Sequence, residues 1–569
     1  MPDTNPGAAR PLPARSPETG RYDAVIVGAG FAGMYQLHRL RGLGLSAIVF
    51  EAADDVGGTW YWNRYPGARC DIESMQYSYS FDEGLQQEWR WAERYAPQPE
   101  ILNYARHVAD RFDLRRDIRF LTRVGSARWD EAEGLWHVAT DRGDRVSARL
   151  CIMATGCLST ARRPDIPGQD DFAGATYHTG HWPHAGVDFS GLRVGVIGTG
   201  SSAIQAIPVI ADQARHLTVF QRTPNFSIPA HNRPIDDDYE KLWKSDYRAR
   251  REKARTMRTG ILYDLSAVPA LEATEEERRR EYEARWANGG TAFMGAYADL
   301  LRDKAANDTA AEFVREKIRG IVEDPAVAEK LMPRDYPIGT KRICVDTDYY
   351  DTFNRDNVTL VDLRAEPIES ITPTGLRTTA AEYEFDALVY ATGFDAMTGA
   401  LTSVDMRGRD GLSLAAKWAE GPRTYLGLMT AGFPNLFMIT GPGSPSVLSN
   451  MIVSIEQHVD WITDCVAWMR AAGQDRIEAT QEAEDAWVAH NNEVAHGTLY
   501  PAAASWYMGA NIPGKPRVFM PYLGGVGVYR EKCAAIAAAG YPGFRLSHSP
   551  AEAGVKAGGV KAGAEAGAA

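Results

Sequence analysis

Short apolar runs alternate along the chain with stretches whose apolar positions recur at helical spacing. Residues 24–27, 47–50 and 194–197 are runs of this kind, each four residues long and bounded by turn residues. Such runs are typical of strands buried on both faces of a parallel sheet, and their alternation with helices predicts an α/β fold with a doubly wound sheet. Residues 235–330 differ, because charged stretches there carry apolar positions at helical spacing. They predict an inserted helical subdomain.

Two of the apolar runs lead directly into glycine-rich turns of the same form. Residues 28–33 read Gly-Ala-Gly-Phe-Ala-Gly, and residues 198–203 read Gly-Thr-Gly-Ser-Ser-Ala. Each predicts a strand, a tight turn and a helix whose N-terminus faces a pyrophosphate. One such fingerprint is weak evidence, but two in one chain indicate a protein that holds two dinucleotides at once and moves electrons between them.

The residues that follow each fingerprint distinguish the two cofactors. Glu51 lies 23 positions after Gly28 and ends a strand, where a carboxylate accepts hydrogen bonds from ribose hydroxyls and repels a ribose phosphate. The same position after Gly198 is Gln221, and Arg222 follows it. A guanidinium suits a 2′-phosphate, although it could also be a solvated charge at a strand end. The first site therefore predicts FAD and the second NADPH.

Composition narrows the class of protein further. With 569 residues, 44% hydrophobic and 24% charged, the chain is long enough for two or three globular domains. Its formal net charge of −12 argues against nucleic-acid binding and against an anionic membrane surface. No apolar run approaches a membrane span, no secretory signal is evident, and the six cysteines form no C-x-x-C pair. We expect a cytoplasmic protein, either a monomer or a small homo-oligomer, with no metal site.

The same patterns predict the domain boundaries. Two apolar runs ending in Ala-Thr-Gly, at 151–156 and 388–393, suit the crossings where the chain leaves the first nucleotide domain and re-enters it. The expected units are a disordered lead over 1–20, a discontinuous FAD-binding domain over 21–160 and 385–545, an NADPH-binding domain over 161–234 and 331–384, the helical subdomain over 235–330, and a disordered tail over 546–569.

A longer motif lies between the two fingerprints. Residues 172–183 fit the pattern F-x-G-x-x-x-H-x-x-x-W-P through Phe172, Gly174, His178, Trp182 and Pro183. In this motif the chain resembles the type I Baeyer–Villiger monooxygenases, and it looks most similar to their phenylacetone monooxygenase branch. The resemblance extends through residues 57–71, 339–342 and 505–516 and covers about residues 22–545.

The resemblance implies a reaction. In this family NADPH reduces FAD, the reduced flavin captures O₂ as a C4a-peroxide, and the peroxide attacks a ketone, giving an ester or lactone and water. We therefore expect a hydrophobic ketone and O₂ as substrates. Such chemistry needs a cation that stabilises the oxyanion and a site from which water is excluded.

The resemblance also assigns roles to single residues. Arg342 matches the catalytic arginine, and Asp71 matches the aspartate that positions it; the alternatives are a structural salt bridge and a turn-capping aspartate. Lys341 would contact the 2′-phosphate together with Arg222 and Thr223. Trp506 matches a tryptophan on a mobile loop that contacts the nicotinamide nucleotide, although a core aromatic is an alternative.

His178 would be a hinge residue of the linker between the domains. The neighbouring His181 and His184 make a metal cluster imaginable, but no cysteine or carboxylate lies close by in the sequence. Val447 stands where members of the phenylacetone branch carry a smaller residue, and Cys157 where they carry a glutamine.

The residues that the resemblance and the fingerprints assign to each ligand are as follows. The FAD set is Gly28, Gly30, Phe31, Ala32, Gly33, Glu51, Thr59, Trp60, Tyr61, Trp62, Asp71, Tyr77, Val124 and Met451. The NADPH set is Arg69, Cys70, Asp71, Gly198, Thr199, Gly200, Ser201, Ser202, Ala203, Ile204, Gln205, Arg222, Thr223, Lys341, Arg342 and Trp506. The ketone pocket would be lined by Ser446, Val447 and Leu448.

Two other functions remain open from the residues. The first is N- or S-oxygenation by the same oxygenated flavin, which uses a protonated peroxide and would not need Arg342. The second is a non-oxygenating NADPH-dependent reductase or a nucleotide-binding protein. A disulfide reductase would need a paired-cysteine relay, and a binding protein would have no use for Asp71, Lys341 and Arg342 together.

Overall fold

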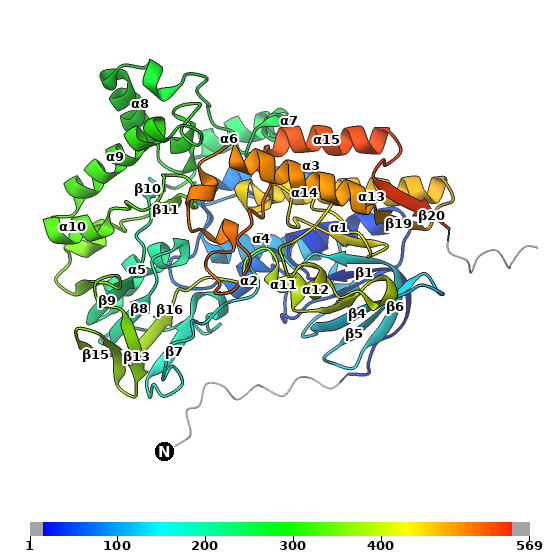
Figure 1. Cartoon of the computed structure of the whole chain (residues 1–569), viewed down its shortest axis with the longest axis horizontal. Helices are drawn as coiled ribbons and strands as arrows, with labels where there is room; N and C mark the ends of the chain where they lie inside the picture. Colours follow the sequence, from blue (N-terminus) through cyan, green and yellow to red (C-terminus); the bar gives the residue numbers. More distant parts are fainter. Residues whose placement is uncertain (1–14, 549–569) are drawn as a thin grey trace, which may run out of the picture.

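The computed structural model describes residues 15–548 and contains two separate nucleotide-binding sheets (Figure 1). The first sheet has the strand order β17-β4-β5-β6-β1-β2-β3, and β18 pairs with β6. Its strands are β1 (Thr19–Val27), β2 (Ala47–Phe50), β3 (Ile118–Arg119), β4 (Val124–Asp130), β5 (Leu135–Thr140), β6 (Arg145–Met153), β17 (Asp405–Arg407) and β18 (Leu436–Met438). β1 runs parallel to β2 and β6, whereas β4, β5 and β6 form an antiparallel meander.

Both faces of β1 are buried, as its apolar run predicts. Ala24 and Ile26 face a core that includes helices on one side, while Val25 and Val27 face the core beneath the meander. Successive strand residues point to opposite faces, so a strand covered on both sides needs apolar residues throughout. The helices associated with this domain are α1 (Phe31–Gly42), α2 (Thr59–Trp62), α3 (Glu83–Glu88), α4 (Gln98–Arg111), α11 (Gly399–Thr402), α12 (Leu414–Lys417), α13 (Met451–Ala471), α14 (Gln481–His496) and α15 (Val526–Ala538).

The second sheet is entirely parallel, with the order β12-β9-β8-β16-β7. It consists of β7 (Ala175–His178), β8 (Arg193–Ile197), β9 (His216–Gln221), β12 (Val358–Asp362) and β16 (Ala387–Tyr390), and α5 (Ser201–Gln213) follows β8. Smaller sheets pair β10 (Ser227–Pro229) with β11 (Cys344–Asp346), β13 (Ile368–Thr372) with β14 (Gly375–Thr378) and β15 (Glu382–Glu384), and β19 (Arg476–Ala479) with β20 (Phe544–Ser547). Because β16 belongs to the second sheet, the chain returns to the first domain after residue 390, later than the predicted 385.

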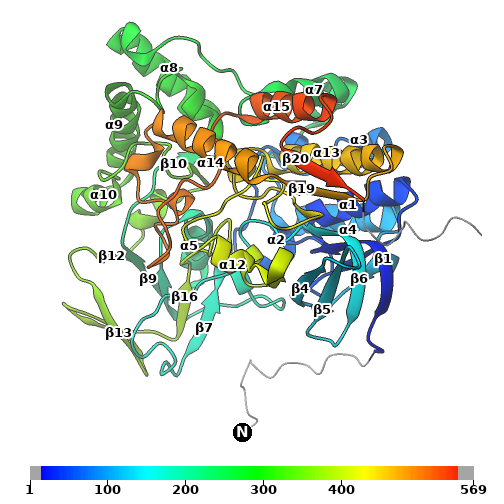
Figure 2. The same cartoon turned by 45° about the vertical axis from the view of Figure 1, so that its right-hand side comes forward.

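The helical segment over 235–330 is not the single subdomain that its pattern predicts. Its helices are α6 (Asp237–Ser245), α7 (Tyr247–Thr256), α8 (Glu275–Asn288), α9 (Lys304–Ile321) and α10 (Pro325–Leu331). Trp243 and Tyr247 pack into the core of the first domain, whereas Tyr282 and Phe313 pack into the core of the second. Figure 2 shows α7 beside α15, away from α8, α9 and α10. The segment therefore bridges both domains, because its apolar positions fit two different cores.

The predicted terminal segments are longer than the structure allows. Thr19 already belongs to β1, and the guanidinium of Arg15 makes two hydrogen bonds of 2.6 Å to the carboxylate of Asp144. At the other end β20 continues to Ser547. The rest of the predicted lead and tail, residues 1–14 and 549–569, lies outside the described residues. None of the described helices is long and apolar enough to cross a membrane.

The first glycine of each fingerprint packs against the backbone at the end of a neighbouring strand, which leaves no room for a side chain. Gly28 has φ +103°, and a Cβ there would lie 2.6 Å from the carbonyl oxygen of Ala154. Gly198 has φ +112°, and its Cβ would lie 2.5 Å from the carbonyl oxygen of Ala391. Ala154 and Ala391 begin the two Ala-Thr-Gly sequences. Each fingerprint glycine therefore contacts the first residue of an Ala-Thr-Gly sequence, and the two nucleotide domains share this arrangement.

We expect Gly198→Ala to lower the stability of the second domain. The substitution combines an unfavourable backbone conformation with a contact of 2.5 Å, which together cost on the order of 1–3 kcal/mol. The measurement is thermal unfolding of the FAD-loaded protein. Gly186→Ala is the matched control, since Gly186 also has a positive φ of +75° but nothing within 4 Å. Equal melting temperatures for the two variants would contradict the assignment.

Candidate active site

A single cavity of about 1090 Å³ connects the two fingerprints. Most of the predicted ligand-binding residues line it: Gly28, Gly30, Phe31, Ala32, Glu51, Thr59, Trp60, Trp62, Arg69, Cys70, Asp71, Tyr77, Val124, Gly198, Thr199, Gly200, Ser201, Ser202, Gln205, Arg222, Thr223, Lys341, Arg342, Val447, Met451 and Trp506. The predicted residues that do not line it are Gly33, Tyr61, Ala203, Ile204, Ser446, Leu448 and the five signature residues. The cavity therefore brings both predicted dinucleotide sites into one space.

At the first fingerprint, Glu51 is buried at the end of β2. Its carboxylate accepts hydrogen bonds from the backbone N–H groups of Ala29 (2.6 Å) and Ala53 (2.8 Å). Burial raises the pKa of the carboxyl, and these two hydrogen bonds oppose that rise. The carboxylate is thus held between the fingerprint turn and the next loop, where an adenosine ribose would meet it.

Asp71 and Arg342 form an ion pair in the cavity wall although they are 271 residues apart. Nε and Nη2 of Arg342 donate to the two carboxylate oxygens of Asp71 at 2.9 and 2.7 Å, and Nη1 donates to the carbonyl of Val447 at 2.7 Å. Burial opposes the positive charge, but Asp71 more than compensates, so the pKa of Arg342 is raised. A permanently charged group is therefore fixed by three hydrogen bonds in a half-buried position.

Arg222 and Lys341 approach each other at the second fingerprint. Arg222 is exposed and, within residues 15–548, makes no hydrogen bond or ion pair; the ammonium of Lys341 lies 4.4 Å from the ring centroid of Tyr336. Burial, and then the charge of Arg222, lowers the pKa of Lys341 to about 8. Gln221 points elsewhere, since its amide donates to the carbonyl of Lys330 at 2.7 Å. In the described part of the chain neither cation is paired with a carboxylate, an arrangement that would suit a bound anion.

The low pKa of Lys341 predicts a pH dependence of nucleotide binding. Below pH 8 Lys341 is charged before the 2′-phosphate arrives, whereas above pH 8 binding must take up a proton. We expect the Kd for NADP⁺ to rise by up to about tenfold per pH unit above 8, measured by flavin absorbance titration. Lys341→Arg keeps its charge and should flatten the profile. A flat wild-type profile from pH 7 to 10 would contradict this prediction.

Within the signature segment over residues 172–183, Gly180 and His181 line the cavity, whereas the five residues that define the motif lie behind its wall. Nδ1 of His178 accepts from the N–H of Gly180 at 2.9 Å, so Nε2 carries the proton and donates to the carbonyl of Arg162 at 3.0 Å. Burial lowers the pKa of His178, which keeps the ring neutral. Trp182 packs against Tyr177 and Phe189. This bonding occupies both ring nitrogens and suits a positioning role in the linker.

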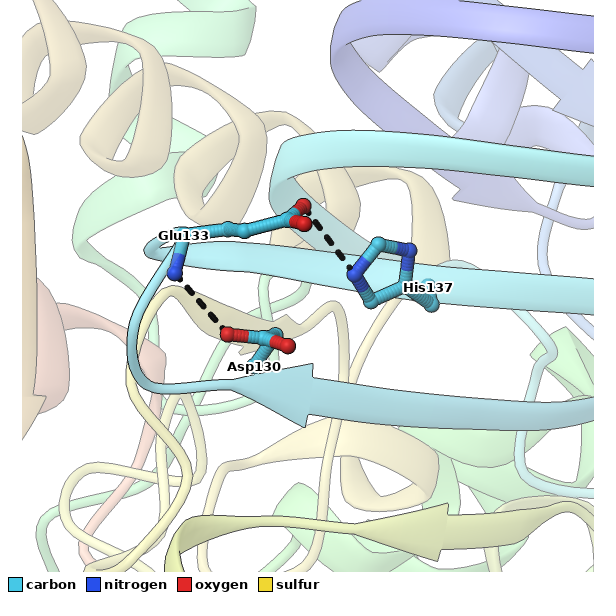
Figure 3. Close-up of side chains that lie close together, drawn as sticks. All are labelled: Asp130, Glu133 and His137. Carbon is cyan, nitrogen blue, oxygen red and sulfur yellow. Dashed lines mark hydrogen bonds and ion pairs between the residues drawn. The ribbon is translucent and has the colours of Figure 1, made fainter. Parts of the chain in front are cut away.

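The other two histidines near the signature make aromatic contacts. The ring of His181 lies 5.7 Å from that of Trp62, and the ring of His184 lies 4.9 Å from that of Tyr61. One group of potential metal ligands does occur in the described part of the chain, at the turn between β4 and β5 (Figure 3). There Asp130 accepts from the backbone N–H of Glu133 at 2.8 Å, and His137 pairs with Glu133 at 3.3 Å. These contacts explain why the three side chains lie together: they cap the hairpin turn between β4 and β5.

Some cavity residues, Arg123 and Arg162 among them, are not indicated by any sequence pattern described above. They belong to no motif with a known spacing, and only the fold places them at the cavity. The two Ala-Thr-Gly crossings at 154–156 and 391–393 also line the cavity, and they carry a visible signal, because each apolar run ends in the same three residues. Ser505 and Asn511 line it as well, within the 505–516 stretch that the resemblance includes.

Two dinucleotide fingerprints that share one cavity, with a fixed guanidinium between them, define an NADP-dependent flavoprotein oxidoreductase. Residues 25–245 match the family described as pyridine nucleotide-disulphide oxidoreductase. A Baeyer-Villiger monooxygenase of Pseudooceanicola batsensis is 46% identical over 91% of this chain and 95% of its own. Phenazine N-monooxygenase PhzNO1 of Lysobacter antibioticus is 43% identical over 93% and 98%. A solved structure of a steroid monooxygenase bound to NADP is 56% identical, covers 93% of this chain and 100% of its own, and has a TM-score of 0.89.

The chain belongs to the Baeyer–Villiger monooxygenase family, as its signature predicts. The predicted α/β fold with FAD- and NADP-binding domains is confirmed, and so are the two cofactors. The enzyme is an FAD-containing, NADPH-dependent monooxygenase. The match to the disulphide oxidoreductase family reflects the nucleotide domains, since all six cysteines are buried free thiols.

Proposed function

We propose that this chain converts a neutral hydrophobic ketone to an ester or lactone. The balanced reaction is ketone + NADPH + H⁺ + O₂ giving ester + NADP⁺ + H₂O. The observation that carries the proposal is the Asp71–Arg342 pair in the wall of a cavity shared by both fingerprints. When bound, FAD supplies electron transfer from NADPH to O₂, and the protein supplies charge, position and exclusion of water.

Arg342 is the group that would stabilise negative charge during oxygen insertion. A guanidinium remains charged at every working pH and offers donors in a fixed plane. Asp71 takes two of these donors and the carbonyl of Val447 a third, so the side chain cannot turn away from the cavity. Asp71 is therefore a positioning residue, and Arg342 the catalytic one.

The surroundings of Arg342 support a neutral, apolar substrate. Cys157, Met397, Val447 and Tyr507 belong to one buried apolar cluster that borders the pair. Burial raises the pKa of Cys157 to about 11, which keeps this thiol neutral. Apolar walls would exclude water from a bound ketone. Arg342 would then be the charged donor available to the ketone oxygen. The similarity to a steroid monooxygenase supports polycyclic ketones as the first substrates to test.

Heteroatom oxygenation is the second candidate, and the similarity to a phenazine N-monooxygenase favours it. That relative is nearly as similar as the Baeyer-Villiger monooxygenase, so overall identity does not separate the two reactions. The ion pair at Arg342 favours the ketone, because attack on an electron-rich nitrogen needs no cation to stabilise an oxyanion. A disulfide reductase is disfavoured because no two cysteines are bonded.

The test is turnover of the purified protein with NADPH and O₂ on a panel of ketones of graded size, including a steroid, and one aromatic amine. We expect one ester per NADPH for at least one ketone. N-oxide formation with no ester would favour the second candidate. Stoichiometric H₂O₂ with every compound would favour the reductase.

We further propose a cytoplasmic monomer or small homo-oligomer, with His178 as a hinge between the domains.

A further inference from the structure

Thr440 lines the cavity in a backbone conformation that its own side chain disfavours. It lies two residues after the end of β18, is only 4% exposed and has φ +57°. A β-branched residue rarely adopts a positive φ, and such strained residues persist only where the surrounding structure holds them. The hydrogen bonds that hold Thr440 therefore help to set the shape of this part of the cavity wall.

A buried histidine of α13 supplies one of these bonds. Nδ1 of His458 accepts from the N–H of Thr440 at 2.9 Å, so Nε2 carries the proton and donates to Oη of Tyr529 at 3.0 Å. The hydroxyl of Tyr529, which belongs to α15, donates in turn to the carbonyl of Leu426 at 2.5 Å. Leu426 also has a positive φ, +59°. The imidazole thus joins two strained backbone segments in one chain of hydrogen bonds.

The ring of His458 is a fixed acceptor and does not carry a charge. Its side chain is fully buried, and burial lowers its pKa to about 3. A protonated ring would have to donate from Nδ1 toward the N–H of Thr440, which is itself a donor. His458 does not line the cavity, so it is placed to hold the wall rather than to exchange protons with a ligand.

The other side of Thr440 leads to Arg342. The carbonyl of Thr440 accepts from Oγ of Ser446 at 3.2 Å, and Ser446, with φ +41°, begins the short helical turn Ser446–Leu448. The carbonyl of the next residue, Val447, accepts from Nη1 of Arg342 at 2.7 Å. The position of that carbonyl therefore depends on where Thr440 lies.

We propose that His458 is a positioning residue for Arg342, acting through the backbone of Thr440 and the turn that carries Val447. Asp71 holds the guanidinium from one side through charge, and this path holds it from the other side through a carbonyl of fixed position. The proposal rests on the proposed function, because it concerns the residue that stabilises the oxyanion. The alternative is a core histidine that stabilises the fold and nothing more.

The test removes the acceptor that the ring provides. In His458→Leu the N–H of Thr440 is left buried without a partner. We expect kcat for ester formation and the ester formed per NADPH each to fall about 3- to 10-fold, with KM for the ketone changed by less than about twofold. The measurements are steady-state turnover of the FAD-saturated protein, with a ketone that the wild type oxidises, and the melting temperature. A lower melting temperature with unchanged kcat and ester yield would overturn the proposal.

A conservative variant separates positioning from packing. In His458→Asn the amide oxygen can take the place of Nδ1 and accept from Thr440, but the side chain cannot reach Tyr529. We expect this variant to regain most of the ester yield although it stays less stable than the wild type. Equal losses of yield in His458→Leu and His458→Asn would count against the proposal.

Two further measurements keep the proposal testable if His458→Leu does not fold. Tyr529→Phe frees the ring from its second bond and should lower the ester yield about twofold or more. Hydrogen exchange of the FAD-loaded protein needs no turnover, and the peptide over residues 439–447 should exchange faster in Tyr529→Phe than in the wild type. Unchanged yield and unchanged exchange in Tyr529→Phe would overturn the proposal.

His490→Leu is the matched control. His490, on α14, also bonds a tyrosine hydroxyl, that of Tyr522 at 3.2 Å, but it is only half-buried and does not line the cavity. We expect its ester yield to equal that of the wild type. If the wild type forms no ester with any ketone, the proposed function fails. If the wild type forms ester and His458→Leu gives the same yield, only the present proposal fails.

Discussion

Arg342→Ala should abolish ester formation while NADPH oxidation continues. Removing one preorganised group that stabilises a developing oxyanion typically slows turnover about 100- to 1,000-fold, and Arg342 supplies a full charge. NADPH and O₂ would still react at the cofactor, so H₂O₂ should replace the ester as the product. The measurement is ester and H₂O₂ formed per NADPH consumed, with a ketone that the wild type oxidises.

The controls for this prediction follow from the ion pair. Arg342→Lys keeps the charge but cannot make both bonds to Asp71, so we expect partial activity. Asp71→Asn keeps the shape but removes the opposing charge, so Arg342 should be less well positioned and the yield of ester per NADPH should fall. Arg90→Ala removes an exposed, paired arginine and should have no effect. Ester formation at the wild-type rate by Arg342→Ala would disprove the catalytic role.

Arg222→Ala should remove the preference for NADPH over NADH. A charge-assisted hydrogen bond contributes about 1.5–3 kcal/mol, so kcat/KM with NADPH should fall roughly 10- to 100-fold. NADH has no 2′-phosphate and should be used as before. The double variant with Lys341→Met should lose still more, because these two cations share the anion site.

The matched control here is Arg279→Ala, an exposed arginine on α8 that pairs with Glu316 outside the cavity. It should leave both nucleotides unaffected. Equal losses with NADPH and NADH in Arg222→Ala would mean that Arg222 supports the fold rather than the phosphate. This outcome would favour the alternative that the sequence left open, in which Arg222 is a solvated charge at the end of a strand.

The register of the two fingerprints is more informative than the fingerprints themselves. Glu51 and Gln221 occupy the matched position after them, and Arg222 follows Gln221; this difference alone predicts which cofactor each fingerprint holds. The signature over residues 172–183 then predicts the family. These inferences succeed because each depends on residues close together in the sequence, where strand and turn geometry fix what a position can do.

The sequence alone therefore determined the two nucleotide domains and the cofactors, and it singled out Asp71 and Arg342 as residues of the site. The family resemblance implies that these two residues meet, but no local pattern shows it, since the ion pair closes over 271 positions and depends on how both domains pack. The sequence patterns also misplaced β16 and treated residues 235–330 as one unit, because an apolar position does not say which core it will join. Arg123 and Arg162 became visible as cavity residues only through the tertiary structure, because facing a cavity depends on how distant segments pack and no local pattern encodes it.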